Sequence, residues 1–152
     1  METAKIVSSA GRYTLPLRNT DRRLDIDMGP LRILIVDDSE TTRRVVGTIL
    51  RSRHWTICGE AENGRTGVEK FQELKPDVVL LDLSMPDMTG IEAAQQMSAA
   101  DPKVPLILFT ILEIEGIGNT AREAGIRAIV PKSEAWSLVA SIERIAANQQ
   151  AS

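Results

Sequence analysis

Five short apolar runs, each followed by a segment whose apolar residues recur at helical spacing, constrain the fold of this sequence more than any other feature. In the intervening segments, apolar side chains recur every three or four positions, as they do on one face of a helix. The runs occupy residues 31–36, 55–59, 78–81, 104–109 and 127–130. Such alternation with short connections predicts a parallel sheet that is covered by helices on both faces. We therefore predict a doubly wound α/β fold with five strands and five helices.

Length and composition fit one globular domain preceded by a tail. The chain has 152 residues, of which 43% are hydrophobic and 26% are charged, as is ordinary for a single globular domain. Residues 1–30 have scattered glycine and proline and no persistent apolar period, so we expect a flexible or loosely docked N-terminal tail. The domain is expected to span residues 31–148, and residues 149–152 are expected to form a short C-terminal tail.

Charge and cysteine content argue against several classes of function. The net charge of −3 gives no overall attraction to nucleic acid or to anionic membranes. The single cysteine, Cys58, allows neither an internal disulfide nor a cysteine metal cluster. No apolar run approaches the roughly 18 residues of a membrane span, and the N-terminus has no apolar core of a secretory signal. We expect a cytoplasmic protein that binds neither nucleic acid nor membrane directly.

Four of the predicted strands end in polar residues with complementary chemistry. Asp37 and Asp38 follow the first strand, Asp82 the third, Thr110 the fourth and Lys132 the fifth. The carboxyl ends of parallel strands share one edge of the sheet, where ligands bind in open α/β folds. Three carboxylates at one edge repel each other unless a cation or protons intervene, and Mg²⁺ is a natural cation for oxygen ligands. With an ammonium and a hydroxyl beside them, they predict a site for phosphoryl transfer.

These residues carry a resemblance to a known family. The segments ILIVDDSE and DVVLLDLSMPDMTG, with Thr110 and Lys132 at matching spacing, resemble the receiver domain of bacterial response regulators. The resemblance covers roughly residues 31–147. Within the family it is closest to receivers that precede a helix-turn-helix output domain. It implies the flavodoxin-like strand order 2-1-3-4-5.

The resemblance implies a role for each residue at this edge. Asp82 is expected to be the nucleophile that becomes the aspartyl phosphate. Asp38, Asp82 and the backbone carbonyl of Ser84 are expected to bind Mg²⁺ or Mn²⁺ directly, and Asp37 through water. Lys132 is expected to pair with the phosphoryl oxygens.

Switching is expected to involve Thr110, Ile129 and the surface around the fourth helix, the fifth strand and the fifth helix. Thr110 would hydrogen-bond to the phosphoryl group after its arrival. The family usually has an aromatic residue where this chain has Ile129, so a rotating ring cannot operate. The resemblance implies a signalling switch that catalyses only its own phosphotransfer and slow autodephosphorylation, and we expect it to stand alone because the chain ends before an output domain could begin. Its partners would be a sensor histidine kinase or phosphotransfer protein and an unidentified downstream protein, and it would act as a monomer or a phosphorylation-dependent homodimer.

Three other functions are compatible with this class of fold. A dehalogenase-like phosphatase acting through Asp82 needs a second carboxylate two residues later, where this chain has Ser84. A flavin or nucleotide binder needs a phosphate loop rich in glycine or hydroxyls after the first strand, where Asp37 and Asp38 would repel phosphate without a metal. A phosphorylation-independent interaction module would keep the fold without needing the acidic site.

Some notable side chains are expected to have no part in the chemistry. We expect Arg43 and Arg44 to be solvated helix surface, with docking of an acidic partner as the alternative, and His54 to be exposed after the first helix. Cys58 is expected to pack within the second strand as a small apolar residue. Trp136 is expected to be a packing residue on the last helix rather than a ligand platform.

Overall fold

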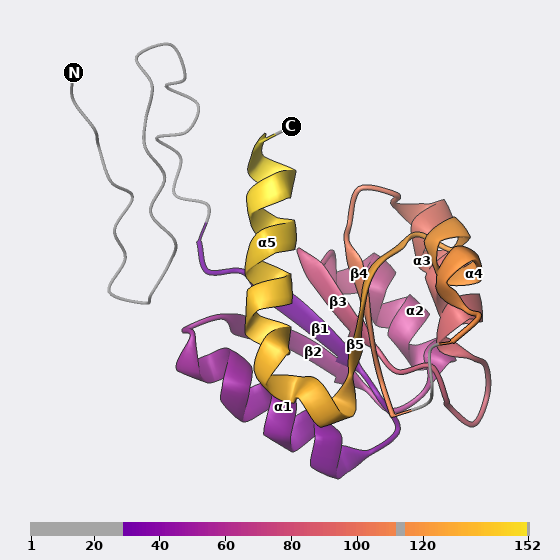
Figure 1. Ribbon diagram of the computed structural model, residues 1–152, viewed down its shortest axis with the longest axis horizontal. Helices are drawn as coiled ribbons and strands as arrows, with labels where there is room; N and C mark the ends of the chain where they lie inside the picture. The colour runs from indigo at the N-terminus through magenta and orange to yellow at the C-terminus, as the bar shows by residue number, and fades with distance from the viewer. Residues whose placement is uncertain (1–28, 112–114, 152) are drawn as a thin grey trace.

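The computed structural model describes residues 29–111 and 115–151 of the chain. Within them it contains a five-stranded parallel sheet in the order β2-β1-β3-β4-β5. The strands are β1 (Arg32–Val36), β2 (Thr56–Ala61), β3 (Val78–Leu81), β4 (Leu106–Thr110) and β5 (Ile126–Pro131). The doubly wound α/β fold and the strand order 2-1-3-4-5 are confirmed (Figure 1). The expected N-terminal tail lies outside the described residues except for Gly29 and Pro30.

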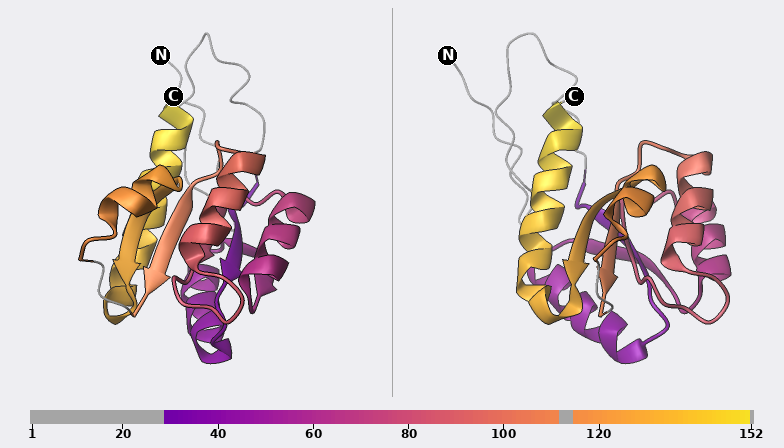
Figure 2. Two further views of the ribbon diagram at one scale, coloured as in Figure 1. Left: turned by 90° about the vertical axis from the view of Figure 1, so that its right-hand side faces the viewer. Right: turned by 45° about the vertical axis from the view of Figure 1, so that its right-hand side comes forward.

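Five α-helices in the described part of the chain cover both faces of the sheet (Figure 2). One face carries α1 (Glu40–Ser52) and α5 (Leu138–Ala151), and the other carries α2 (Gly64–Leu74), α3 (Gly90–Ala100) and α4 (Gly118–Glu123). The last helix continues through residues 149–151, which the sequence pattern assigned to a C-terminal tail. A 3₁₀ segment, Lys132–Ser137, joins β5 to α5 and was not predicted. Among the described helices, none combines the length and the apolar character that crossing a bilayer requires.

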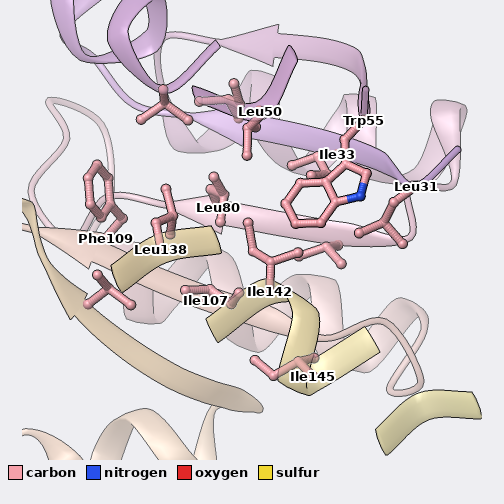
Figure 3. Close-up of a cluster of buried hydrophobic side chains, with 14 of the residues drawn as sticks. Leu31, Ile33, Leu50, Trp55, Leu80, Ile107, Phe109, Leu138, Ile142 and Ile145 are labelled. Atoms are coloured by element: carbon pink, nitrogen blue, oxygen red, sulfur yellow. The ribbon is translucent and has the colours of Figure 1, made fainter. Parts of the chain in front are cut away.

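Two apolar layers hold the sheet between its helices. Because successive strand residues point to opposite faces, the residues of β1 alternate between the layers. Ile33 and Ile35 face α1 and α5, whereas Leu34 and Val36 face the other three helices. The first layer also contains Leu50, Trp55, Leu80, Ile107, Phe109, Leu138, Ile142 and Ile145 (Figure 3). Burial on both faces therefore explains why the central strands are continuous apolar runs.

The two tryptophans differ in their surroundings. Trp136 lies in the 3₁₀ segment with 78% of its surface exposed, so the prediction of a packing residue on the last helix is wrong. Trp55 fills the core just before β2, and the Arg53 guanidinium carbon lies 6.0 Å from its ring centroid. His54 is exposed and Cys58 is half-buried in β2, as predicted.

Polar caps determine where the helices near the carboxyl edge of the sheet begin. The Ser39 hydroxyl accepts a hydrogen bond from the third residue after it at 3.2 Å, and the Asn63 side chain does the same at 2.8 Å. Thr89 and Glu92 form a reciprocal capping box at the start of α3. These caps satisfy amides that a helix leaves without partners at its first turn, and they fix the loops that follow β1, β2 and β3.

Gly90, the first residue of α3, lies directly against the backbone of Asp82. A Cβ atom at position 90 would lie 2.2 Å from the carbonyl oxygen of Asp82, so the backbone would have to move. We predict that Gly90→Ala lowers the free energy of unfolding by about 1–3 kcal/mol, as overpacking commonly does. Urea denaturation measures the change. Gly118→Ala is the matched control, because a Cβ atom there meets nothing within 4 Å. An equal loss in both variants would contradict the packing explanation.

Candidate functional site

The parallel register of β1 and β3 brings two acidic residues together at the carboxyl edge of the sheet. Val36, the last residue of β1, pairs with Leu81, the last residue of β3. The amide of Asp82 donates a hydrogen bond to the carbonyl of Val36 at 2.9 Å. Asp37 and Asp82 therefore leave neighbouring strands side by side, as the sequence predicted.

The end of β4 and the start of the 3₁₀ segment complete this edge. Thr110, which is fully buried, pairs with Pro131 of β5, and Lys132 follows directly. Ile129 pairs with Leu108, two residues further back along the sheet, and packs half-buried in the layer under α2, α3 and α4. Of the two expected switch residues, Thr110 thus lies at the site and Ile129 lies away from its edge.

Three carboxylates and one ammonium gather at this edge. Oxygens of Asp37, Asp38 and Asp82 all lie within 4.8 Å of one another. The Lys132 Nζ lies 2.8 Å from Oδ2 of Asp37 and 3.4 Å from Oδ2 of Asp82, and it also lies 3.5 Å from the Thr42 hydroxyl. Asp37 and Asp82 are buried, whereas Asp38 is exposed. Lys132 therefore pairs with the two buried carboxylates and leaves the third open to solvent.

Asp82 combines burial with an incomplete set of partners. Its residue surface is 5% exposed, and among the described residues its Oδ1 atom is a buried oxygen with no hydrogen-bond donor. Burial raises the pKa of Asp82 above its ordinary value, the neighbouring Asp37 carboxylate raises it further, and Lys132 opposes both effects only in part. A cation against Oδ1 would satisfy this oxygen and relieve the repulsion.

The donor set fits Mg²⁺ or Mn²⁺. Both are hard cations that prefer oxygen ligands, and carboxylates are their usual protein ligands. Asp38 and Asp82 present two carboxylates, with Asp37 beside them. Ser84, whose carbonyl was expected to be a further ligand, is exposed in the loop after β3, two residues beyond Asp82.

One residue at this site was missed because arginines on a helix are commonly solvated. The Arg43 Nη1 donates to the carbonyl oxygen of Asp37 at 2.6 Å, and its Nε donates to the Glu60 carboxylate at 3.1 Å. Its side chain is only 15% exposed. Arg44 is exposed and pairs with an acidic residue of its own helix, so solvation is confirmed for Arg44 and wrong for Arg43. One signal in the sequence could have indicated this contact. Arg43 lies one turn after the Ser39 cap, and long helical side chains point toward the N-terminus of the helix, where Asp37 lies.

Asp87 was also not predicted to have a role, and its hydrogen bonds hold the loop after β3 against α2. Its Oδ2 accepts from the Arg65 amide at 2.8 Å, and its Oδ1 accepts from the amides of Gly64 and Met88 at 2.9 Å. The hydrogen bond from Arg65, together with the others, lowers the pKa of the Asp87 carboxyl. Because Asp82 begins the same loop, Asp87 anchors this loop to the N-terminus of α2.

Comparison with known proteins identifies the family. The family model of the response regulator receiver domain matches residues 33–143. The chain belongs to this family. The match favours a receiver over the phosphatase and over the flavin or nucleotide binder.

Relatives and solved structures agree with the assignment. The chemotaxis protein CheY of Thermotoga maritima is 37% identical over 101 residues, which cover 66% of this chain and 84% of that protein. A LuxR-family response regulator from Aurantimonas sp. SI85-9A1 superposes with a TM-score of 0.74 at 30% identity, covering 79% of this chain and 87% of that one. A Borrelia burgdorferi structure, a CheX-CheY-BeF3-Mg²⁺ complex, matches with a TM-score of 0.69 at 26% identity. The match covers 74% of this chain and 89% of that one.

Receiver domains are signalling switches of two-component systems, and they bind Mg²⁺ at an acidic pocket. In this receiver, Asp37, Asp38 and Asp82 form an acidic cluster at the edge of the sheet where such a pocket is expected. The family also interacts with kinases and downstream targets.

Without bound metal, the stability of this receiver should depend on pH through Asp82. A folded-state pKa above the unfolded value means that ionisation of Asp82 destabilises the fold as the pH rises through that folded pKa. We predict that Asp82→Asn is more stable than wild type by about 1 kcal/mol at neutral pH, because an amide avoids the burial of a charge and also the repulsion from Asp37. The gain should shrink as the pH falls toward the unfolded pKa of about 3.9.

Denaturant unfolding in the presence of a chelator, at a series of pH values, measures this difference. Asp101→Asn serves as the control, because Asp101 is exposed at the end of α3 and far from the carboxylate cluster in the sequence. If the advantage of Asp82→Asn instead grew on acidification, the raised pKa described for Asp82 would be wrong.

Proposed function

We propose that this receiver is a switch that accepts a phosphoryl group on Asp82 from a sensor histidine kinase or a phosphotransfer protein. The main observation behind the proposal is the set of contacts that the two oxygens of the Asp82 carboxylate make. One of its oxygens contacts the Lys132 ammonium, and the other is buried with no hydrogen-bond partner among the described residues. Such a carboxylate can bind a cation through one oxygen and attack phosphorus through the other.

The proposed transfer forms one bond and breaks one. A carboxylate oxygen of Asp82 attacks the phosphorus of a phosphohistidine, so that an O–P bond forms while the N–P bond of the donor breaks. The electron pair of the broken bond stays on the imidazole nitrogen, which takes a proton from solvent. Mg²⁺, when bound, supplies positive charge that offsets the charge of the phosphoryl oxygens.

The charges of the site support a divalent cation. Three carboxylates and one ammonium would carry two net negative charges if all four were ionised, which one Mg²⁺ would neutralise. In this proposal Asp38 and Asp82 bind the metal directly, together with the Ser84 carbonyl, and Asp37 binds it through water. Lys132 pairs with the incoming phosphoryl oxygens, which removes it from its present contacts with the carboxylates.

Thr110 provides the proposed link to a protein-binding surface near α4, β5 and α5. Its hydroxyl would donate a hydrogen bond to the phosphoryl group, and the backbone after β4 would move with it. Ile111 follows directly and is 76% exposed, so this movement would displace an apolar side chain on the surface. Because Ile129 is aliphatic, the change would proceed through backbone and packing rather than through rotation of a ring. The proposed output is binding of a downstream protein or phosphorylation-dependent dimerisation, without direct contact with nucleic acid.

Phosphorylation of Asp82 can be tested with a small acyl phosphate and Mg²⁺. We predict that wild type gains one phosphoryl group that is stable in acid and labile in base, as an acyl phosphate should be. Asp82→Asn should gain none, because its amide cannot act as the nucleophile. Mass spectrometry of the intact protein measures the gain, and Asp101→Asn should be labelled like wild type. Equal labelling of the Asp82→Asn variant at another residue would refute the assignment.

Removal of Asp38 tests the metal site separately from the chemistry. We predict that Asp38→Asn raises the Kd for Mg²⁺ about tenfold or more, equivalent to about 1.4 kcal/mol, because it removes a charged ligand. Calorimetric titration with MgCl₂ measures the affinity without any phosphodonor. An unchanged Kd would exclude Asp38 as a direct ligand.

A further inference from the structure

Arg43 connects the acidic edge of the sheet to β2. Its guanidinium donates one hydrogen bond to the Asp37 carbonyl at 2.6 Å and another to Glu60 of β2 at 3.1 Å. The Glu60 backbone carbonyl in turn accepts from the Lys70 ammonium of α2 at 2.5 Å. Arg43 is therefore held by the Asp37 carbonyl on one side and by Glu60 on the other. With only 15% of its side chain exposed, it has little room to move.

The hydrogen bond from Arg43 is one of four contacts that hold Asp37 in place. The Asp37 amide donates to the Ala61 carbonyl at 2.9 Å, and its Oδ1 accepts from the Ser39 amide at 2.8 Å. Its Oδ2 contacts Lys132 at 2.8 Å. With Arg43 on its carbonyl oxygen, every polar group of Asp37 has a partner. The carbonyl of Asp37 and the amide of the next residue share one rigid peptide plane, so this contact also fixes the backbone that leads into Asp38.

We propose that Arg43 is a positioning residue that orients Asp38 for the divalent cation by holding the peptide between Asp37 and Asp38. This inference rests on the proposed role of Asp38 as a metal ligand. Asp38 itself is exposed, so contacts with its backbone, rather than burial of its side chain, must determine the direction of its carboxylate. Groups that orient metal ligands commonly affect affinity by about 10- to 100-fold when they are removed.

The charge of Arg43 acts in the opposite direction from its proposed positioning role. A guanidinium near the acidic cluster repels a cation, so its removal should strengthen Mg²⁺ binding if charge were its only effect. Glu60, which pairs with Arg43, offsets this repulsion. Loss of positioning therefore predicts a higher Kd for Mg²⁺ when Arg43 is replaced, whereas loss of charge alone predicts a lower one.

The test is a calorimetric titration of the metal-free protein with MgCl₂, well below its melting temperature, for Arg43→Gln and Arg43→Lys. We expect Arg43→Gln to raise the Kd about tenfold although it removes a positive charge. Arg43→Lys should raise it by a smaller factor, because an ammonium keeps the charge but lacks the fork that joins the carbonyl to Glu60. Arg44→Gln is the matched control: it removes the same charge from the next, exposed position and should leave the Kd within about twofold of wild type.

A loss of general stability must be separated from a loss of positioning. Arg53→Gln breaks the 2.8 Å ion pair with Glu143 of α5 and the contact with Trp55, all in a different part of the structure. Thermal unfolding of the metal-free variants ranks their stabilities. We expect Arg53→Gln to lower the melting temperature without changing the Kd for Mg²⁺. Arg43→Lys should raise the Kd even where its melting temperature is no lower than that of Arg53→Gln.

The outcomes distinguish the two proposals. Tighter or unchanged Mg²⁺ binding in Arg43→Gln, together with weaker binding in Asp38→Asn, would overturn the positioning role and leave the proposed function intact. Unchanged binding in Asp38→Asn would overturn the direct-ligand role of Asp38, on which the positioning role rests, and leave phosphorylation of Asp82 to its own test. If Arg43→Gln does not fold, Arg43→Lys decides alone, and a wild-type Kd in that variant would overturn the inference.

Discussion

Two buried carboxylates lie at neighbouring strand ends, and the ammonium of Lys132 is the charge that holds them together. Because the register of β1 and β3 fixes both backbones, Asp37 and Asp82 cannot separate without breaking strand pairing. The distances of 2.8 and 3.4 Å from Lys132 compensate part of their repulsion. Lys132 follows β5, at the opposite end of the sheet from β2, so the same contacts tie β5 to the centre of the sheet. A group that draws Lys132 away from the carboxylates must therefore alter how β5 is held.

The fold and the centre of the site were predictable because both depend on local signals. The apolar run of β3 indicates a strand buried on both faces, and Asp82 is the residue that follows it. The same reasoning places Asp37 after β1 and Lys132 after β5, and parallel strands then bring them to one edge. Trp136 was predicted incorrectly because the helical spacing of the last segment begins only at Leu138. Nothing in that spacing indicates the 3₁₀ segment that turns the ring outward.

The contacts of Arg43 and Asp87 depend on long-range geometry that residue spacing does not encode. Glu60 reaches Arg43 because the pairing of β1 with β2 shifts by one residue between Ile33 and Leu34, which places Glu60 opposite Ile35. A sequence without its register gives no indication of this shift, and an arginine on a helix is ordinarily read as solvated. The partners of Asp87 on α2 lie 22 and 23 residues away, beyond the range of any turn motif.

The contrast between the two tryptophans gives the receiver a built-in pair of optical reporters. Trp55 is buried between the sheet and its helices, so its emission follows the integrity of that core layer. Trp136 is exposed four residues after Lys132, where its emission follows solvent and charge at the end of β5. Replacing either ring by phenylalanine would isolate the signal of the other. Global unfolding and local rearrangement at the acidic edge can then be followed as separate spectral events in an unlabelled protein.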